Sequence, residues 1–241
     1  MTRVVISQPM YFPWAGFMAQ MALADVFIWL DDAQFSKGSF TNRVRVKTEG
    51  GLKWMSIPLY NKGKNTRILD LASISSDWKA SHTSLLSQSL RRQPYLKDAI
   101  EIFNAAIDKA TLVETLIASA EIPAEVMGIK PKRILRSSSM GVSGSSWERV
   151  LRMTLEVGGT EYITGHGAVN YLNHEAFESD GVQVSYMNYK PSPWHQSHGL
   201  FTPYVPILDL LASVMVPQAA SYLVPATVNW RTFIENGLTG S

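Results

Sequence analysis

Residues 3–32 read RVVISQPMYFPWAGFMAQMALADVFIWLDD, and this stretch decides the fold class. The apolar run at 3–7 predicts a strand that is buried on both faces, as strands of parallel sheets are. Residues 17–24 have a helix-forming composition, and residues 26–30 form a second apolar run. A strand, a helix and a second strand within about 30 residues match a βαβ crossover. The sequence therefore predicts an α/β protein with a mostly parallel, Rossmann-like, three-layer core.

The rest of the chain adds a hairpin and a helical segment to this core. Residues 43–48 and 52–59 flank the turn Glu49-Gly50-Gly51 and predict a basic β-hairpin. A short strand is expected near 67–72. Helices are expected over 77–93, in two pieces over 96–120, and from Pro123 to Gly128. We expect one domain spanning 1–241, with a helical insertion or lid at about 76–130.

Alternation of strands and helices resumes after the insertion. Strands are expected at 132–137, 162–164 and 182–186, and helices at 147–157, 171–178 and 207–214. The chain has no cysteine, which excludes disulfides, thiolate metal sites and a cysteine nucleophile. Residues 1–9 lack the longer apolar core and the small-residue cleavage site typical of a signal peptide, and no apolar run is near the roughly 18 residues of a membrane span. These features predict a cytoplasmic protein without membrane insertion.

Charge is concentrated in one part of the chain. The net charge is +2, from 22 basic and 20 acidic residues, which is too balanced to predict DNA binding. Residues 33–67 nevertheless carry +7, and one acidic residue, Glu49, opposes eight basic ones: Lys37, Arg43, Arg45, Lys47, Lys53, Lys62, Lys64 and Arg67. The window is either a solvated hairpin face or a site for an anionic small molecule that carries a phosphate or nucleotide. Arg43 and Arg45 share one strand face, which suits recognition of phosphate oxygens.

Polar and aromatic motifs follow the predicted strands. The loop after the first strand contains Gln8, Tyr11 and Trp14, and Gly16 allows a close approach to the backbone at a helix N-terminus. These residues are either substrate contacts or edge packing. Asp31 and Asp32 follow the second strand and can act as a general base or orient an amine, or else cap a turn and pair with a cation. Three further substrate-binding candidates follow them: Gln34, Lys37 and Asn42.

Two later loops supply the remaining candidates. Residues 136–146 form a Ser/Gly-rich loop before a helix, in which Arg136, Ser138 and Ser139 could hold a phosphate, although an ordinary capped loop explains the composition equally well. His166 in a glycine turn is a candidate catalytic residue. His195 and Gln196 are candidate substrate contacts, and the prolines before His195 argue against a metal site with His198. No metal is expected.

The chain resembles the WbqC-like protein family over about residues 4–212. Five groups of residues carry the resemblance: Ser7-Gln8-Pro9, Tyr11-Phe12-Pro13-Trp14 and Gly16-Phe17; Asp25-Val26-Phe27-Ile28, Leu30-Asp31-Asp32 and Gln34-Phe35; Asn42-Arg43, Trp54 and Ile57-Pro58; Ser138-Ser139, Gly158-Gly159, Tyr162, Gly165, Tyr171-Leu172 and Phe177; and Gln196 with Ile207-Leu208-Asp209. Gly159 stands where family members more usually have alanine. A weaker likeness to nucleotidyl-transferase-like ligases lacks their two signature histidines.

The resemblance implies a biosynthetic enzyme, but it does not identify catalytic residues in this chain. The function it favours is transfer of an acyl or aminoacyl group, of the glycine type, onto an amino sugar or related amine in surface-polysaccharide (O-antigen) or natural-product biosynthesis. An ATP-dependent amide ligase or cyclase is an alternative, and a non-catalytic protein that binds a sugar nucleotide or a tRNA end is another. The cofactor stays open between a nucleotide and an activated acyl donor, and tRNA stays open as a partner.

Overall fold

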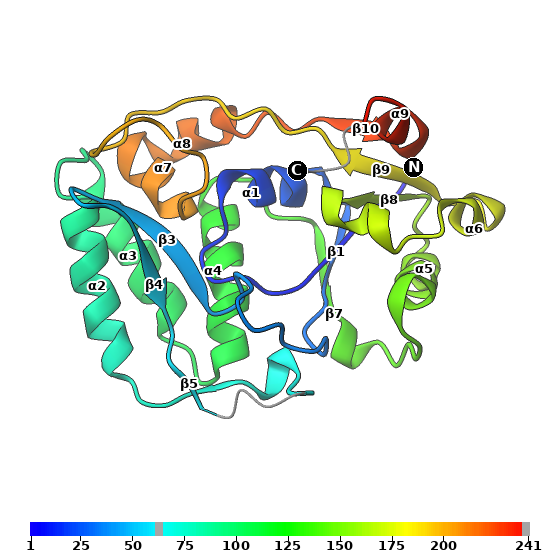
Figure 1. The fold of residues 1–241 in the computed structure, drawn as a ribbon, viewed down its shortest axis with the longest axis horizontal. Coiled ribbons are helices and arrows are strands. Elements are labelled where there is room, and N and C mark those ends of the chain that lie inside the picture. The colour runs from blue at the N-terminus through cyan, green and yellow to red at the C-terminus, as the bar shows by residue number, and fades with distance from the viewer. Residues whose placement is uncertain (61–64, 238–241) are drawn as a thin grey trace.

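The computed structural model describes residues 1–60 and 65–237, and its centre is a six-stranded sheet (Figure 1). The sheet order is β10-β9-β8-β1-β2-β7. Five strands are parallel, and β10 runs antiparallel to β9. The strands are β1 (Arg3–Ser7), β2 (Val26–Trp29), β7 (Arg133–Arg136), β8 (Glu161–Thr164), β9 (Gln183–Met187) and β10 (Thr227–Asn229).

The strand order confirms the predicted fold class. Numbered by their appearance in the sheet, the strands lie in the order 3-2-1-4-5-6, which is that of the Rossmann fold. The chain builds outward in one direction from β1 and then in the other from β8. Ligands of such sheets bind at the carboxyl ends of the strands, near this reversal. Ser7 and Thr164 end the two central strands there.

Helices cover both faces of the sheet because the central strands are apolar on both sides. Val5 and Phe27 belong to the buried cluster that contains α1 (Ala15–Leu23) and α4 (Leu112–Val126). Val4 and Val26 belong to the cluster on the opposite face. The helices that contribute to that second cluster are α5 (Ser146–Glu156), α6 (His174–Ser179) and α9 (Trp230–Glu235).

A hairpin and helices form the end of the molecule away from β8, β9 and α6 (Figure 1, left). The elements there are β3 (Arg43–Thr48), β4 (Gly51–Ser56), β5 (Leu59–Tyr60), β6 (Ala72–Ser73), α2 (Asp77–Ser89), α3 (Leu96–Ile107), α7 (Ile207–Ser213) and α8 (Val216–Ala219). Their buried residues belong to the same cluster as α1, so the helical segment packs continuously onto the core. Its action as a lid stays a prediction.

Two sequence predictions about local structure were wrong. Pro123 was expected to begin a helix, but it lies inside the last turns of α4. That helix begins at a capping box between Thr111 and Glu114, and a proline near its end removes only one backbone bond. The strand expected near 67–72 is a 3-10 turn, Ile68–Asp70, followed by β6. In residues 1–60 and 65–237, no helix has the length and apolar character needed to cross a membrane.

Candidate functional site

Three of the predicted site residues meet at a small apolar cavity, which we call the aromatic pocket. Its volume is about 280 Å³. It lies between the loop after β1, strand β3 and the segment before α7. The residues that line it are Met10, Tyr11, Phe12, Pro13, Trp14, Phe40, Val44, Arg45, Tyr204 and Val205. Tyr11, Trp14 and Arg45 were predicted from the sequence, whereas Phe40, Tyr204 and Val205 were missed because nothing in their local sequence marks them.

Backbone hydrogen bonds hold the loop that forms the floor of this pocket. The amide of Tyr11 donates to the carbonyl of Phe40 at 3.1 Å, and the carbonyl of Pro13 accepts from the amide of Ile207 at 2.9 Å. Ser119 of α4 accepts from the amide of Phe12 at 3.0 Å and donates to the carbonyl of Met10 at 2.9 Å. Phe12 has a φ of 43°, a conformation that non-glycine residues adopt rarely and mostly where the surroundings enforce it.

Position 16 requires glycine because of how the Trp14 side chain packs against it. A Cβ atom at Gly16 would lie 2.2, 2.4 and 2.5 Å from three ring atoms of Trp14. The indole of Trp14 therefore makes the close approach that the glycine allows, which agrees with the packing alternative of the sequence analysis. The same ring contacts Tyr189 and Tyr204, with centroids 5.8 and 5.3 Å away. Gly16 thus seats the side chain that forms one wall of the pocket.

We expect Gly16→Ala to lower the free energy of unfolding by about 1–2 kcal/mol, because the new methyl group must displace the Trp14 ring. Chemical denaturation and near-ultraviolet circular dichroism measure the two effects. Gly50→Ala is the control, since its nearest neighbour would be 3.9 Å from the new atom. Trp14→Phe removes the colliding atoms, so the double variant should lose less than the two single losses added together. Full additivity would contradict this packing.

Tyr11 is tied to a histidine that the sequence analysis did not single out. Its hydroxyl lies 2.9 Å from Nδ1 of His82, and Nε2 of His82 lies 3.2 Å from the carbonyl oxygen of Ser56. A carbonyl only accepts, so Nε2 donates and Nδ1 accepts from Tyr11. Burial lowers the pKa of His82 to about 4 and raises that of Tyr11 well above its ordinary value. Both side chains are therefore neutral at pH 7.

Arg43 and Arg45 share the outer face of the hairpin, as their spacing predicted. Arg45 pairs in register with Trp54 of β4, and its guanidinium carbon lies 5.5 Å from the centroid of that indole. Arg43 lies closer, at 4.1 Å, and donates to the carbonyl of Gly38. Among residues 1–60 and 65–237, neither arginine forms an ion pair, and the Nε atom of each is buried without a hydrogen-bond partner. Lys62 and Lys64 of the basic window lie outside the described residues.

Asp31 belongs to a second group, at the carboxyl ends of β2 and β7. Its side chain has no exposed surface. It accepts from Arg136 Nε at 2.6 Å and from the amide and hydroxyl of Ser138 at 3.0 and 2.8 Å, and Ser137 Oγ lies 3.2 Å away. Burial alone would raise the pKa of Asp31, but the bonds from Ser138 and Arg136 outweigh it and leave this pKa below its ordinary value. These contacts favour a structural role over that of a general base.

Asp32 binds Arg149 of α5, which the sequence analysis missed. The two nitrogens of Arg149 lie 3.0 and 2.6 Å from the two carboxylate oxygens, and Ser137 Oγ donates at 2.6 Å. Burial raises the pKa of Asp32, and the bonds from Arg149 and Ser137 more than compensate, so the net shift is downward. The side chain keeps 17% of its surface exposed. The catalytic role of this pair stays a prediction, and the exposed surface of Asp32 suits that role better than the full burial of Asp31.

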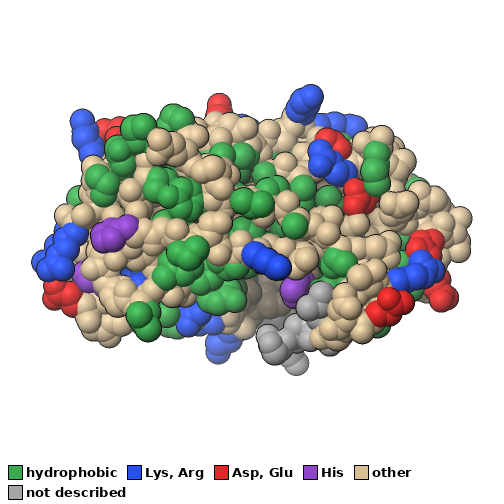
Figure 2. All heavy atoms as spheres, turned by 90° about the horizontal axis from the view of Figure 1, so that it is seen from above, with side chains coloured by type: hydrophobic (Ala, Val, Ile, Leu, Met, Phe, Trp, Pro, Cys, Tyr) green, Lys and Arg blue, Asp and Glu red, His purple; other side chains and the backbone are tan. Residues whose placement is uncertain are grey.

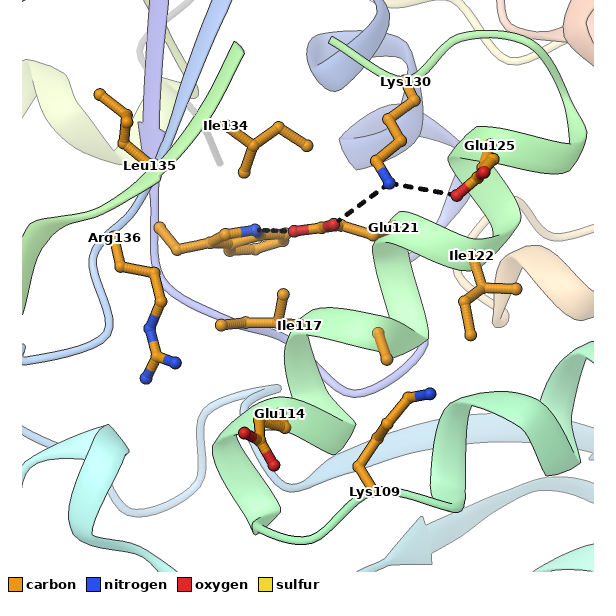
Figure 3. Close-up of a pocket in the computed structure, with 12 residues that line it drawn as sticks. Lys109, Glu114, Ile117, Glu121, Ile122, Glu125, Lys130, Ile134, Leu135 and Arg136 are labelled. Atoms are coloured by element: carbon orange, nitrogen blue, oxygen red, sulfur yellow. Dashed lines mark hydrogen bonds and ion pairs between the residues drawn. The ribbon is translucent and has the colours of Figure 1, made fainter. Parts of the chain in front are cut away.

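Arg136 also stands at one end of a wide groove between β7 and α4, which Figure 3 shows. The groove has a volume of about 550 Å³. Trp29 Nε1 donates to Glu121 at 2.8 Å, and Lys130 bridges Glu121 and Glu125 at 3.5 and 3.1 Å. Glu121 and Glu125 are thus both paired with Lys130.

The segment 191–206 is fixed by a buried polar network. Lys47 Nζ donates to Gln196 Oε1 at 2.8 Å and to the carbonyl of Leu200 at 2.6 Å. Trp194 donates to Asp209 at 2.6 Å, and Gln93 donates to the carbonyl of His195 at 3.0 Å. Burial lowers the pKa of Lys47 and raises that of Asp209. Gln196 and His195 therefore hold the segment that carries Tyr204 to the aromatic pocket.

Several candidates lie apart from both groups. Asn42 donates to the carbonyl of Ile57 at 2.9 Å, and Gln34 forms an isolated bridge with Arg67. His166 Nε2 lies 2.7 Å from the carbonyl of Met187, and its ring contacts Phe233. The side chains of Gln8, Lys37 and Ser139 make no hydrogen bond to another described residue. Within residues 1–60 and 65–237, no hydrogen bond or ion pair joins Arg43 or Arg45 to the Ser137–Ser139 turn, so their joint action on one phosphate stays a prediction.

The structure combines a Rossmann-like α/β sheet with a helical segment packed against it and a pocket lined by aromatic side chains and one arginine. The WbqC-like protein family matches residues 8–220, and the chain belongs to this family. It is 29% identical over 240 residues to an uncharacterized protein of Mycobacterium tuberculosis, Rv1507c, and the match covers 92% of this chain and 98% of that protein. No solved structure matches the chain significantly. Membership of the family therefore does not identify a reaction for this protein.

The family motifs fall on features that shape the site. The motif residues of 11–17 form the pocket floor and the Trp14–Gly16 contact, and Asp31 and Asp32 anchor the strand ends. Packing explains why this chain has glycine at position 159, where family members more usually have alanine. A Cβ atom there would lie 2.5 Å from a methyl group of Val4 and 2.8 Å from the carbonyl oxygen of Thr154. Alanine at 159 therefore requires a rearrangement around β1.

Proposed function

We propose that this protein transfers an acyl or aminoacyl group from an activated donor onto the amine of an amino sugar or a related compound. The observation that carries the proposal is Arg45, a cation without a carboxylate partner among the described residues, on the wall of an otherwise apolar pocket. A guanidinium in such a place favours a ligand with an anionic group beside an apolar part. A phosphorylated substrate whose acyl or sugar portion enters the pocket meets both requirements.

The proposed reaction forms an amide and releases the carrier of the acyl group. The acceptor nitrogen attacks the carbonyl carbon, a C–N bond forms, and the bond to the leaving oxygen or sulfur breaks with its electron pair. The nitrogen loses one proton, and the leaving group gains one. Asp32 is the proposed proton acceptor because it keeps exposed surface, while Asp31 orders Ser138. His166 stays a more distant candidate, since Nε2 already contacts the carbonyl of Met187.

The test of the proposal is amide formation detected by mass spectrometry. Nucleotide-linked amino sugars serve as acceptors, and an aminoacyl thioester, an acyl phosphate and an aminoacyl-tRNA serve as donors. We expect amide product with one donor class, and Arg45→Gln to lower kcat/KM at least tenfold, the loss of one charge-assisted contact. Arg92→Gln, at an exposed arginine outside the pocket, should leave the rate unchanged. Equal losses in both variants, or no amide with any donor, would contradict the proposal.

The second candidate is an ATP-dependent amide ligase or cyclase. The strand order favours it, because this order is shared with nucleotide-binding α/β proteins, although such an analogy concerns the fold alone. Calorimetry with ATP and Mg²⁺ separates the candidates. Saturable binding together with amide formation that consumes ATP would support the ligase. Amide formation without ATP would support the transferase.

A further inference from the structure

The outer face of the hairpin carries exposed aromatic rings beside the two unpaired arginines. We call Phe40, Arg43, Arg45 and Trp54 the Trp54 face. Trp54 is 44% exposed and Phe40 is 46% exposed, and their ring centroids are 5.9 Å apart. The hairpin lies at the left end of the molecule in Figure 1, beside α2, and buries Val44 and Met55 on its inner side. The inner side therefore explains the stability of the hairpin, and the outer side needs another explanation.

The charges of the two arginines on this face are not neutralised by any acidic residue among the described residues. Two other cations of the basic window have partners: Lys47 is bonded to Gln196, and Arg67 pairs with Asp70 at 2.7 Å. Arg43 and Arg45 have no acidic partner among the described residues, and each has a buried Nε without an acceptor. A buried donor without an acceptor is costly, so such an atom calls for an explanation such as a ligand. The contact with Trp54 orients both guanidinium groups but supplies no hydrogen-bond acceptor.

The geometry restricts the chemistry of that ligand. Cα atoms two residues apart on a strand are roughly 6–7 Å apart, so two guanidinium groups on one face suit two anionic groups better than one. The exposed rings suit a flat, apolar surface, and both aromatic and guanidinium planes stack on nucleobases. Inorganic phosphate would leave the rings uncovered, and a hydrocarbon chain would leave the arginines unpaired. A nucleoside diphosphate supplies a flat base to cover the rings and two phosphate groups to pair with the arginines.

We infer that the Trp54 face binds the nucleoside diphosphate portion of a substrate, with the base on Trp54 and Phe40 and the phosphates on Arg43 and Arg45. This inference rests on the proposed function, in which the group attached to the nucleotide enters the aromatic pocket. Phe40 and Arg45 belong to both surfaces and join them. A single-stranded RNA fits less well, because a polyanion needs an extended row of free cations and the chain is close to neutral.

Calorimetry on the full-length protein tests this inference with four probes: UDP, ADP, inorganic pyrophosphate and uridine. We expect both nucleotides to bind at least tenfold more tightly than pyrophosphate or uridine. Trp54→Leu should remove that advantage and weaken pyrophosphate binding much less than nucleotide binding, and Trp54→Phe should keep most of the advantage. Arg43→Gln should weaken binding of the nucleotides and of pyrophosphate together. Tyr60→Leu, at another exposed aromatic residue, is the matched control.

The outcomes separate this inference from the proposed function. Equal affinities for UDP and pyrophosphate, or unchanged UDP binding by Trp54→Leu with an intact melting curve, would overturn the assignment of the base and leave Arg45 as an anion contact. Tighter binding of a single-stranded oligoribonucleotide than of UDP would overturn it in favour of RNA. Nucleotide binding that depends on Trp54, without amide formation, would overturn the transferase and leave the Trp54 face in place.

Discussion

Asp31→Asn is expected to lower the free energy of unfolding by about 3 kcal/mol, since it removes the charge from a fully buried carboxylate that is paired and hydrogen-bonded. Asp31 accepts three hydrogen bonds, from Arg136 and Ser138, and all three donors approach a group without donors of its own. An asparagine keeps one oxygen and places an NH₂ group against at least one of these donors. The penalty therefore includes a repulsive contact as well as the lost ion pair.

Urea denaturation at pH 7 measures the effect, and Asp70→Asn is the control. Asp70 pairs with Arg67 at 2.7 Å on an exposed surface, where an ion pair contributes little, so its variant should keep the midpoint of the parent protein. The same variants separate two roles for Asp31. Lost stability supports the structural role that the contacts favour. Unchanged stability with lost amide formation would instead make Asp31 the general base.

Acidification from pH 6.5 to pH 4 is expected to destabilise the protein by about 3 kcal/mol through His82 alone. Burial lowers the pKa of His82 to about 4, whereas an unfolded histidine titrates near 6.5. Between these values the unfolded chain binds a proton that the folded protein excludes. Stability therefore falls as the pH falls through this window, and about 2.5 pKa units correspond to about 3 kcal/mol.

His82→Asn isolates this contribution because its side-chain oxygen can still accept from Tyr11 without titrating. We expect unfolding free energies measured from pH 7 to pH 4 to have a smaller slope in this variant. Burial also lowers the pKa of His174 and raises that of Asp209, so a comparison of slopes is needed. Equal slopes in the parent protein and the His82→Asn variant would contradict a buried, neutral His82.

The lowered pKa values of Asp31 and Asp32 act in a different range. Stability that arises from a lowered carboxylate pKa is present above the unfolded value near 3.9 and is lost as the pH falls through the folded value. That loss begins where the His82 effect ends. The two contributions can therefore be read from separate parts of one pH series.

Sequence reasoning found the strand-end residues but could not say how they are used. Asp31 and Asp32 follow an apolar strand, and their place at the carboxyl edge of the sheet follows from that. Arg136 and Arg149, which neutralise them, lie more than one hundred residues away in the chain. Only the pairing of β2 with β7 and the packing of α5 bring these charges together. For this reason both carboxylates of a pair that looked catalytic form ion pairs, and the proposed catalytic role falls on Asp32, which keeps exposed surface.

The sequence by itself determined the α/β class, the basic hairpin and the shared face of Arg43 and Arg45, because periodicity and turn residues act over a few positions. Tertiary structure alone decided which groups remain free. It pairs Lys47 with Gln196, seats Trp14 on Gly16, and leaves Arg45 beside an apolar cavity. Whether a charge is neutralised depends on neighbours distant in the chain, whose positions follow from the packing of the whole core.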